Sequence, residues 1–169
     1  MGEDLGADGR MAVRTPMQWS QGATGGFSTA PTRRLVQRVV PGEYGPARVS
    51  VTGQLHDPDS LWTFVRKLIS VYRSCPELGW GTWRVVEQDD PSVLVHLCEV
   101  EGTAVLAVHN LGSEPVSVPV TVDPRGDGLE AVDLFSAEVV TSKRSTTLLL
   151  DGYGFRWLRV RPAGDLAIP

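Results

Sequence analysis

One segment near the start of the chain brings together residue types suited to binding a polar ligand. Residues 14–19 read Arg-Thr-Pro-Met-Gln-Trp, and Gly26-Phe27 follow closely. Arg14 is a fixed cation with a planar fork of N–H donors, which suits carboxylates and vicinal hydroxyls. Trp19 and Phe27 could provide apolar walls beside it. The same residues could instead form a turn at Pro16 that leaves Arg14 in solvent.

The other candidate reactive groups have less support. Cys75 and Cys98 are the two cysteines, too few for a disulfide framework or a tetrahedral zinc site, and both are predicted to be buried thiols. His96 and His109 fall in predicted strands without the spacing of metal ligands, so we expect structural histidines. Neither a metal nor a cofactor is predicted.

Length and charge limit the function classes. The chain has 169 residues, 41% of them hydrophobic, and 16 basic against 20 acidic residues give 16 − 20 = −4. One domain or one and a half fit this length, but a complete barrel enzyme does not. Without a basic run, nucleic acid is not an expected partner. No apolar stretch could span a membrane and the start at residues 1–4 is acidic, so we predict a cytoplasmic protein.

The segment that carries Arg14 is predicted to be mostly loop. Residues 1–56 are rich in glycine and proline and show little periodicity, which allows at most short turns. Structureless stretches beyond about 12 to 15 residues are usually functional or disordered. Because Trp19, Phe27 and Tyr44 lie in this segment, we expect an ordered, functional loop.

A single amphipathic helix is predicted over residues 58–75. Asp57 suits the N-cap, Pro58 suits the first helical position, and Pro76 ends the pattern. The apolar residues at helical spacing are Leu61, Phe64, Val65, Leu68, Ile69 and Tyr72. Burying each large apolar side chain is worth roughly 1.5 to 3 kcal/mol, so this face needs a partner surface. We expect that surface upstream of the chain, or association of chains through the helix.

From residue 83 onward, short β-rich runs alternate with turn residues. The runs are 83–87, 93–99, 104–109, 116–122, 129–134, 138–141, 146–150 and 155–160. Asn, Asp, Gly and Pro between them supply turn geometry. The pattern predicts a mainly β fold with an antiparallel sandwich.

These motifs together resemble the α-amylase superfamily, glycoside hydrolase family 13, in the branch that holds α-glucosidases, oligo-1,6-glucosidases and trehalose synthases. There, Arg-Thr-Pro-Met-Gln-Trp is a signature, which residues 14–19 match, and a Gly-Phe turn follows it. The resemblance continues through Gln54, Asp57-Pro58, Arg73 and residues 76–81. Residues 153–158 resemble the last strand of that family's C-terminal β domain.

The resemblance implies that the chain corresponds to the tail of such an enzyme. In the family, a (β/α)8 barrel carries the chemistry and a β-sandwich packs beside it. Residues 1–82 match the loop after the eighth barrel strand and the eighth helix, as a remnant of the last βα unit, and residues 83–169 match the sandwich. The earlier strands have no counterpart here, so Met1 resembles an internal methionine of a longer ancestor.

The same resemblance implies that the chain holds no catalytic residue. Retaining glycoside hydrolysis needs a carboxylate nucleophile and a carboxylic acid about 5 to 5.5 Å apart. The family draws these groups, and a third stabilising Asp, from earlier barrel strands. Glu3, Asp4 and Asp8 could be considered as replacements, but loop carboxylates near a terminus are usually solvated. The chain alone is therefore expected to be inactive.

One binding role carries over from the family. Its motif Arg pairs with an upstream Asp and contacts the 4-hydroxyl of the non-reducing glucose in the −1 subsite, and Arg14 stands at this position. Gln18 and Trp19 would shape the loop, Trp19 by packing rather than by stacking on sugar. Ser20 stands where many glucosidases have Asp, as in trehalose-synthase-like members. The choice of α-glucoside, and of hydrolysis or transfer, stays open.

Two functional hypotheses follow, besides a purely structural relic whose exposed apolar patch is prone to association. The first is the C-terminal part of an enzyme that hydrolyses α-glucosides or transfers glucose from them, with a maltose-type or trehalose-type substrate or a maltooligosaccharide as partner once a barrel is supplied. The second is a stand-alone carbohydrate-binding or interaction module. Trp62 and Trp83 are expected in a core or an interface rather than as sugar platforms.

Overall fold

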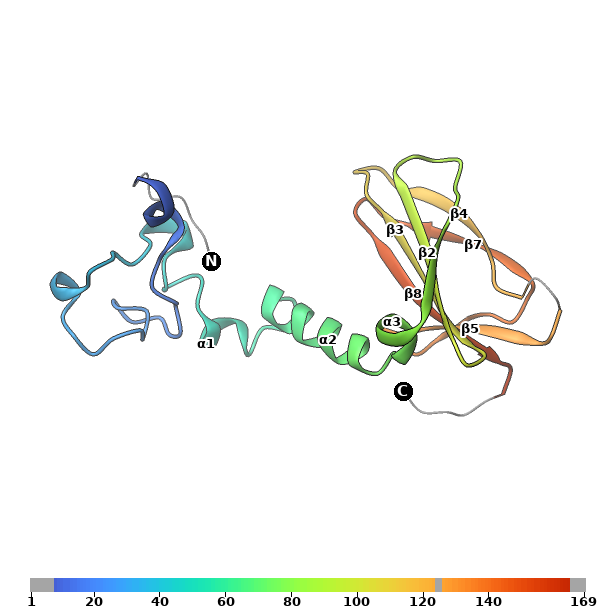
Figure 1. Cartoon of the computed structure of the whole chain (residues 1–169). Helices are drawn as coiled ribbons and strands as arrows, with labels where there is room; N and C mark the ends of the chain where they lie inside the picture. The colour runs from blue at the N-terminus through green and yellow to red at the C-terminus, as the bar shows by residue number, and fades with distance from the viewer. Residues whose placement is uncertain (1–7, 124–125, 165–169) are drawn as a thin grey trace. The chain divides into compact units, whose positions relative to one another are not determined.

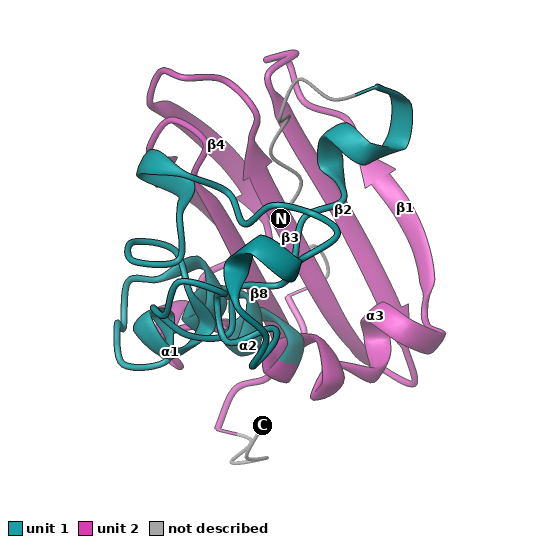
Figure 2. Cartoon of the chain, turned by 90° about the vertical axis from the view of Figure 1, so that its left-hand side faces the viewer, with its two compact units in different colours: residues 1–69 teal, residues 70–169 magenta. Residues whose placement is uncertain are grey.

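The computed structural model describes residues 8–123 and 126–164. The chain divides into two compact units, residues 1–69 and residues 70–169 (Figure 2). The predicted boundary between a barrel remnant at 1–82 and a sandwich at 83–169 concerns the domains of the relatives, and it stays a prediction.

The first unit consists mainly of loops with short helical turns between them (Figure 1). Three 3-10 turns span Gly9–Val13, Thr32–Arg34 and Gly42–Tyr44, and the single-turn helix α1 spans Val51–Gln54. The hydroxyl of Ser50 caps α1 by accepting a hydrogen bond from the N–H of Gly53 at 3.3 Å. The prediction of a loop with short turns is therefore confirmed for residues 8–56. Residues 1–7, with the candidate carboxylates Glu3 and Asp4, lie outside the described residues.

The amphipathic helix begins later than predicted. Helix α2 spans Leu61–Arg73, not 58–75. The carboxylate of Asp57 accepts a hydrogen bond from the N–H of Asp59, which makes a local turn, and the hydroxyl of Ser60 accepts from the N–H of Thr63 at 3.2 Å. Ser60 therefore takes the capping role that was assigned to Asp57.

No residue of α2 is buried. The apolar positions Leu61, Phe64, Val65, Ile69 and Tyr72 are all exposed. The apolar face predicted from the sequence therefore exists, and its side chains are exposed. No helix in the described part of the chain is long and apolar enough to cross a membrane.

A short helix that the sequence analysis missed connects α2 to the sheet. Helix α3 spans Pro76–Trp80, with Pro76 in its first turn and Glu77 buried. Pro76 ends one helix and begins the next, since a missing N–H costs nothing in a first turn. After it, the backbone at Gly81 lies so close to the carbonyl oxygens of Glu77 and Glu99 that a side chain would not fit.

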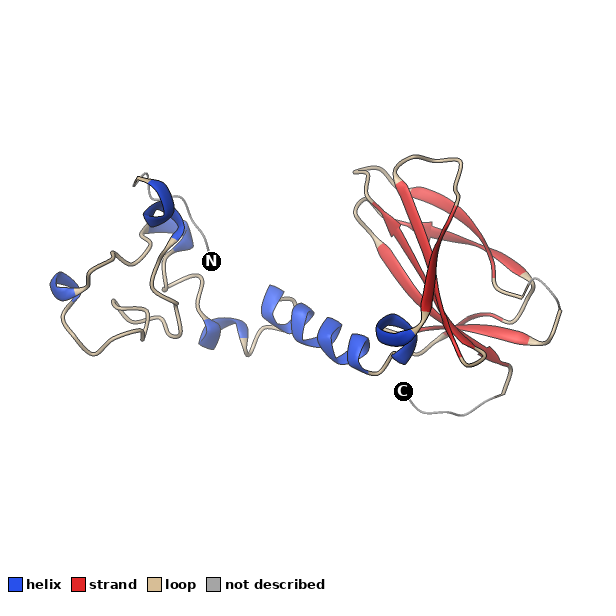
Figure 3. Ribbon diagram, in the orientation of Figure 1, coloured by secondary structure: helices blue, strands red, loops and turns tan. Residues whose placement is uncertain are grey.

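The rest of the second unit is an antiparallel β-sandwich (Figure 3), so the predicted fold class is confirmed. The strands are β1 (Thr82–Val86), β2 (Val93–Val100), β3 (Thr103–Asn110), β4 (Val116–Thr121), β5 (Leu129–Asp133), β6 (Val139–Thr141), β7 (Ser145–Leu150) and β8 (Phe155–Pro162). One sheet has the order β1-β2-β3-β8-β5-β6, and β4 pairs with β7 in the other. All pairs are antiparallel.

The core lies between the two sheets and consists mainly of branched aliphatic side chains. Its buried members are Val95, Leu106, Val108, Val118, Val120, Val122, Ala131, Leu148, Leu150, Leu158 and Val160. Strand β4 alternates buried and exposed residues, as expected for a strand with one wet face. In β3, residues 105–108 are buried consecutively, because α3 packs against its other face.

A buried carboxylate fixes the turn after β5. Oδ1 of Asp133 accepts hydrogen bonds from the N–H groups of Phe135 (2.8 Å) and Ser136 (3.0 Å), and Oδ2 accepts from Nη1 of Arg156 at 2.9 Å. Burial alone would raise the pKa of Asp133, but the hydrogen bonds and the Arg156 charge outweigh it. The net pKa lies below the ordinary value of 3.8.

Asp133→Asn should lower the free energy of unfolding at pH 7 by about 1 to 3 kcal/mol, because the amide loses the charge that these donors stabilise. A carboxyl with a depressed pKa stabilises the fold above its unfolded pKa, and this contribution disappears as the pH falls through the folded value. The difference between the two proteins in urea unfolding should therefore shrink below pH 3.8. Glu87→Gln, at an exposed position, is the control; a difference that is equal at every pH would contradict this account.

Candidate functional site

The signature segment at residues 14–19 is anchored by the side chain of Gln18. This side chain is buried, and its Nε2 donates hydrogen bonds to the carbonyl oxygens of Tyr44 (2.9 Å) and Val49 (2.7 Å). The backbone carbonyl of Gln18 accepts from the N–H of Val51 at 2.9 Å. One residue thus holds three stretches of the first unit together.

The backbone after Gln18 forms a tight turn. The N–H groups of Trp19 and Ser20 both donate to the carbonyl of Gly25, at 2.6 and 3.0 Å. Gly25 and Gly26 have φ of 63° and 69°, and a Cβ on Gly26 would collide with the hydroxyl of Ser20. Both glycines are required here, because φ is left-handed and the turn is closely packed.

Arg14, the predicted substrate-binding residue, lies outside this hydrogen-bonded network. Its side chain is exposed, and no described residue makes a hydrogen bond or ion pair with its guanidinium. The ring of Trp19 is 51% exposed, and Phe27 is exposed as well. The structure therefore brings Gln18 and Trp19 together on one anchored turn and leaves Arg14 exposed, four residues before Gln18 in the sequence.

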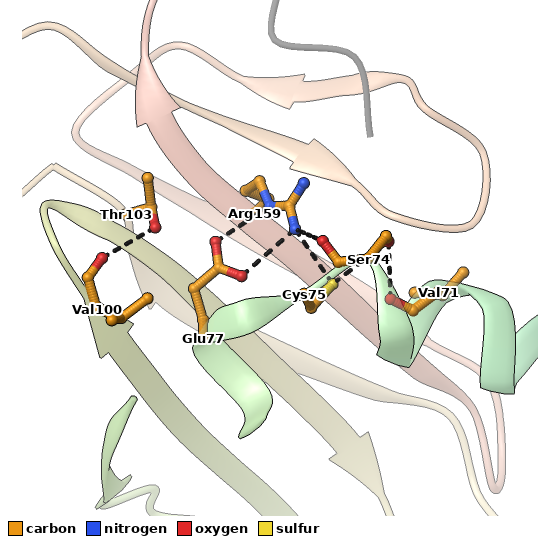
Figure 4. A network of polar contacts seen from close by, with 7 residues as sticks. All are labelled: Val71, Ser74, Cys75, Glu77, Val100, Thr103 and Arg159. Carbon is orange, nitrogen blue, oxygen red and sulfur yellow. Dashed lines mark hydrogen bonds and ion pairs between the residues drawn. The ribbon is translucent and has the colours of Figure 1, made fainter. Parts of the chain in front are cut away.

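A second polar cluster, which the sequence analysis did not find, lies in the second unit (Figure 4). Nη2 of Arg159 on β8 donates to the carbonyl of Ser74 (2.8 Å), to Sγ of Cys75 (3.3 Å) and to Oε2 of Glu77 (3.3 Å). Nε of Arg159 lies 3.2 Å from Oε1 of Glu77, an ion-pair contact whose geometry is not that of a hydrogen bond. The side chains are 16% and 2% exposed. The pair fastens α3 and the end of α2 to the sheet.

The two cysteines have no catalytic environment. Burial raises the pKa of the Cys75 thiol, against the opposing effect of the Arg159 charge, and burial together with the charge of Glu77 raises that of Cys98. Both are buried free thiols, as predicted, and they stay protonated at neutral pH. Within residues 8–123 and 126–164, no three His, Cys, Asp or Glu side chains are grouped as metal ligands would be.

Aromatic rings cover part of the outer face of the larger sheet. His96 and His109 stack with 5.7 Å between ring centroids, and Phe155 and Trp157 continue the row. Burial lowers the pKa of both histidines. Trp83 on β1 is 69% exposed, so of the two expected positions for this residue, a core or an interface, only the interface stays a prediction.

Breaking the Glu77–Arg159 pair should be costly. Arg159→Met leaves an almost fully buried carboxylate without its counterion, and we expect a loss of about 3 to 5 kcal/mol in the free energy of unfolding. The double variant Glu77→Leu/Arg159→Met should recover much of this loss, because it removes both charges. The exposed pair Arg84–Glu99, at 3.9 Å, provides the control: Glu99→Gln should cost less than about 1 kcal/mol. Losses that simply add in the double variant would contradict the predicted coupling.

Comparison with known proteins shows that this chain is similar to the C-terminal parts of related enzymes. The model of the sucrose hydrolase-like C-terminal domain matches residues 102–159. The trehalose synthase of Pimelobacter sp. (strain R48) is 32% identical over 95% of this chain and 29% of its own length. That of Thermus thermophilus is 32% identical over 96% of this chain and 17% of its own length. The probable oligo-1,6-glucosidase 2 of Bacillus subtilis is 33% identical over 64% and 18%.

Solved structures agree with the sequence relatives. The trehalulose synthase MutB from Pseudomonas mesoacidophila MX-45 superposes with a TM-score of 0.67 at 26% identity, over 90% of this chain and 26% of that one. The chain spans between 17% and 29% of the length of the relatives described above. By sequence and by fold, it corresponds to the C-terminal part of the α-amylase superfamily, glycoside hydrolase family 13, in the branch of trehalose synthases and oligo-1,6-glucosidases.

Proposed function

We propose that the chain forms the C-terminal part of an enzyme that acts on α-glucosides, by hydrolysis or by glucosyl transfer. One observation carries the proposal: trehalose synthases match nearly the whole chain, including its first unit, where a buried Gln18 anchors the signature turn. Maltose, trehalose and maltooligosaccharides are the candidate substrates. Sucrose joins them, because one solved relative is a MutB variant in complex with the substrate sucrose.

In this proposal the reacting carboxylates come from the portion of the enzyme that the chain does not match. Hydrolysis with retention needs two carboxyl groups on either side of the glycosidic bond. Barrel enzymes hold such groups at the carboxyl ends of several strands, and the described residues include no barrel strand. The chain contributes a wall of the site and the sandwich, and alone it is expected to be inert.

Arg14 is the residue proposed to touch the substrate. Its guanidinium is exposed and makes no hydrogen bond with the described residues, so its N–H donors are available to a sugar hydroxyl. Gln18 would position Arg14 without touching the substrate, because its hydrogen bonds to the carbonyl oxygens of Tyr44 and Val49 hold the backbone that carries Arg14. Trp19 is proposed to shape the loop by packing against the missing portion, which would cover its half-exposed ring.

The apolar face of α2 is proposed to lie against that same portion. Five large apolar side chains of this helix are exposed, and leaving them in water forfeits roughly 1.5 to 3 kcal/mol for each one that could be fully buried. In the chain by itself, this face would promote association. Nucleic acid and membrane are not proposed as partners, and the two free thiols agree with a reducing, cytoplasmic location.

The stand-alone carbohydrate-binding module remains the alternative, and one observation favours it. Trp80 is 87% exposed and Trp83, three residues later in the sequence, is exposed as well, and exposed tryptophans are the surfaces that such a module would use. The alternative requires neither Arg14 nor a barrel, so the effect of Arg14 on turnover separates the two hypotheses.

Arg14 can be tested in a chimera in which this chain replaces the matching segment of the Pimelobacter trehalose synthase. Arg14→Ala should lower kcat/KM for trehalose formation from maltose by about 10- to 100-fold, the effect of losing one charge-assisted hydrogen bond. Arg14→Lys should recover only part, because an ammonium does not reproduce the fork. Arg33→Ala, another exposed arginine of the same unit, is the matched control. Equal kcat/KM for both alanine variants, or a folded chimera without activity, would contradict the proposal.

A further inference from the structure

A long groove opens between the two sheets of the sandwich, on the side of β1. The larger sheet has six strands and the smaller one has two, so β4 and β7 leave part of the inner face of the larger sheet uncovered. The groove has a volume of about 1200 Å³, with inward-facing side chains of β1 and β2 on one wall and β4 on the other. None of its described lining residues belongs to α2 or α3.

The inside of the groove is apolar and incompletely covered. Val86, Val93, Leu97 and Val116 line it, and all four are partly exposed while they pack against the buried core of the sandwich. Covering side chains of this kind removes apolar area from water, which favours a partner that brings an apolar face of its own.

The rim of the groove is strongly acidic. Among the described lining residues, seven are Asp or Glu and one, Arg84, is basic. Three of the acids have partners: Glu99 lies 3.9 Å from Arg84, Asp90 accepts hydrogen bonds from Ser92, and Asp123 accepts from four backbone N–H groups. The other four side chains make no hydrogen bond or ion pair with the described residues, and we call them the free rim carboxylates: Glu87, Asp89, Glu101 and Asp127.

The free rim carboxylates lie at the two ends of the groove. Glu87 and Asp89 belong to the connection that precedes β2, and Glu101 belongs to the turn that follows it. The pairings of β5 with β8 and of β8 with β3 place Asp127 at the same end as Glu101. Strand β2 has eight residues, so the two ends are about 25 Å apart at about 3.3 Å per residue. A complementary partner therefore carries basic side chains at both ends and apolar ones between them.

The free edge of β4 is poorly suited to the addition of another strand. The N–H of Val122 donates to the carbonyl of Arg144 at 2.9 Å, in the register of the ladder with β7. Because backbone groups alternate in direction, those of Ser117, Pro119 and Thr121 point away from β7, and Pro119 has no N–H to donate. A helix satisfies its own backbone groups, and about 17 residues of helix span about 25 Å.

We propose that this groove is a docking surface for a basic amphipathic helix of a partner protein. The apolar face of that helix lies against Val86 and Leu97, and Lys or Arg side chains at its two ends meet the free rim carboxylates. The proposal concerns binding only, and it does not depend on the role assigned to Arg14. A single helix of this length should bind with a Kd of about 10 to 100 μM, and more weakly as salt screens the rim.

The test is a fluorescence-anisotropy titration of the 169-residue chain with two labelled synthetic peptides of about 17 residues. In the first peptide, leucines form one helical face and lysines occupy the first and last turns. The second peptide has the same composition, but its leucines and lysines alternate as they would in a strand.

Two double variants remove the charges of one end of the groove each, at exposed positions where folding should not be affected: Glu87→Gln/Asp89→Asn and Glu101→Gln/Asp127→Asn. The matched control removes two exposed acids of the same unit that lie outside the lining: Glu114→Gln/Glu138→Gln.

We expect saturable binding of the first peptide, with a Kd that rises about 3- to 10-fold in each rim variant and is unchanged in the control. The proposal is overturned if binding does not saturate, if the alternating peptide binds equally well or better, or if the control weakens binding as much as the rim variants do. Binding that neither rim variant weakens would place the peptide elsewhere, such as on the exposed face of α2, and would also overturn it. So would self-association of the chain that the rim variants abolish, because a second copy would then fill the groove.

Discussion

The ion pair between Glu77 and Arg159, which is largely excluded from water, determines how helix α3 is attached to the sheet of the second unit. Glu77 is almost wholly excluded from water, and a carboxylate in such a place is tolerated only with its counterion and further hydrogen bonds. Arg159 bonds to the carboxylate and also to the carbonyl of Ser74, the residue that follows α2. The pair therefore fixes α3 on the sheet, where α3 packs against β2 and β3.

The contrast between the two ends of α2 supports the proposal that this chain is part of a larger enzyme. Its C-terminal end is tied to β8, yet no residue along the helix is buried. A wide apolar stripe on a helix forms in folded proteins because another surface covers it. The signature turn shows the same contrast: Gln18 is buried and its Nε2 is bonded within the first unit, while Arg14, Trp19 and Phe27 are exposed. Both features leave side chains exposed that another part of a longer protein could cover. The relatives are several times longer than this chain.

The sequence predicted the secondary-structure elements that a local residue pattern specifies. All eight strands lie within two residues of their expected bounds, because alternation and turn residues specify a strand locally. The predicted start of α2 was wrong. Asp57 and Ser60 are both suitable N-cap residues, and the sequence does not show that Asp57 bonds within a local turn while Ser60 caps the helix. Helix α3 was missed because five residues carry no periodicity. The partners of Gln18 lie 26 and 31 residues away, and no pattern in the sequence links them.

The central claim is that the catalytic carboxylates of the enzyme lie outside this chain. Glucose release from maltose, trehalose and sucrose by the purified 169-residue protein tests it most directly, at protein concentrations high enough to detect a single turnover. The account predicts no release above the rate in buffer. Release that disappears when one carboxylate of this chain is replaced by its amide would contradict it, because the chain would then hold a catalytic acid of its own.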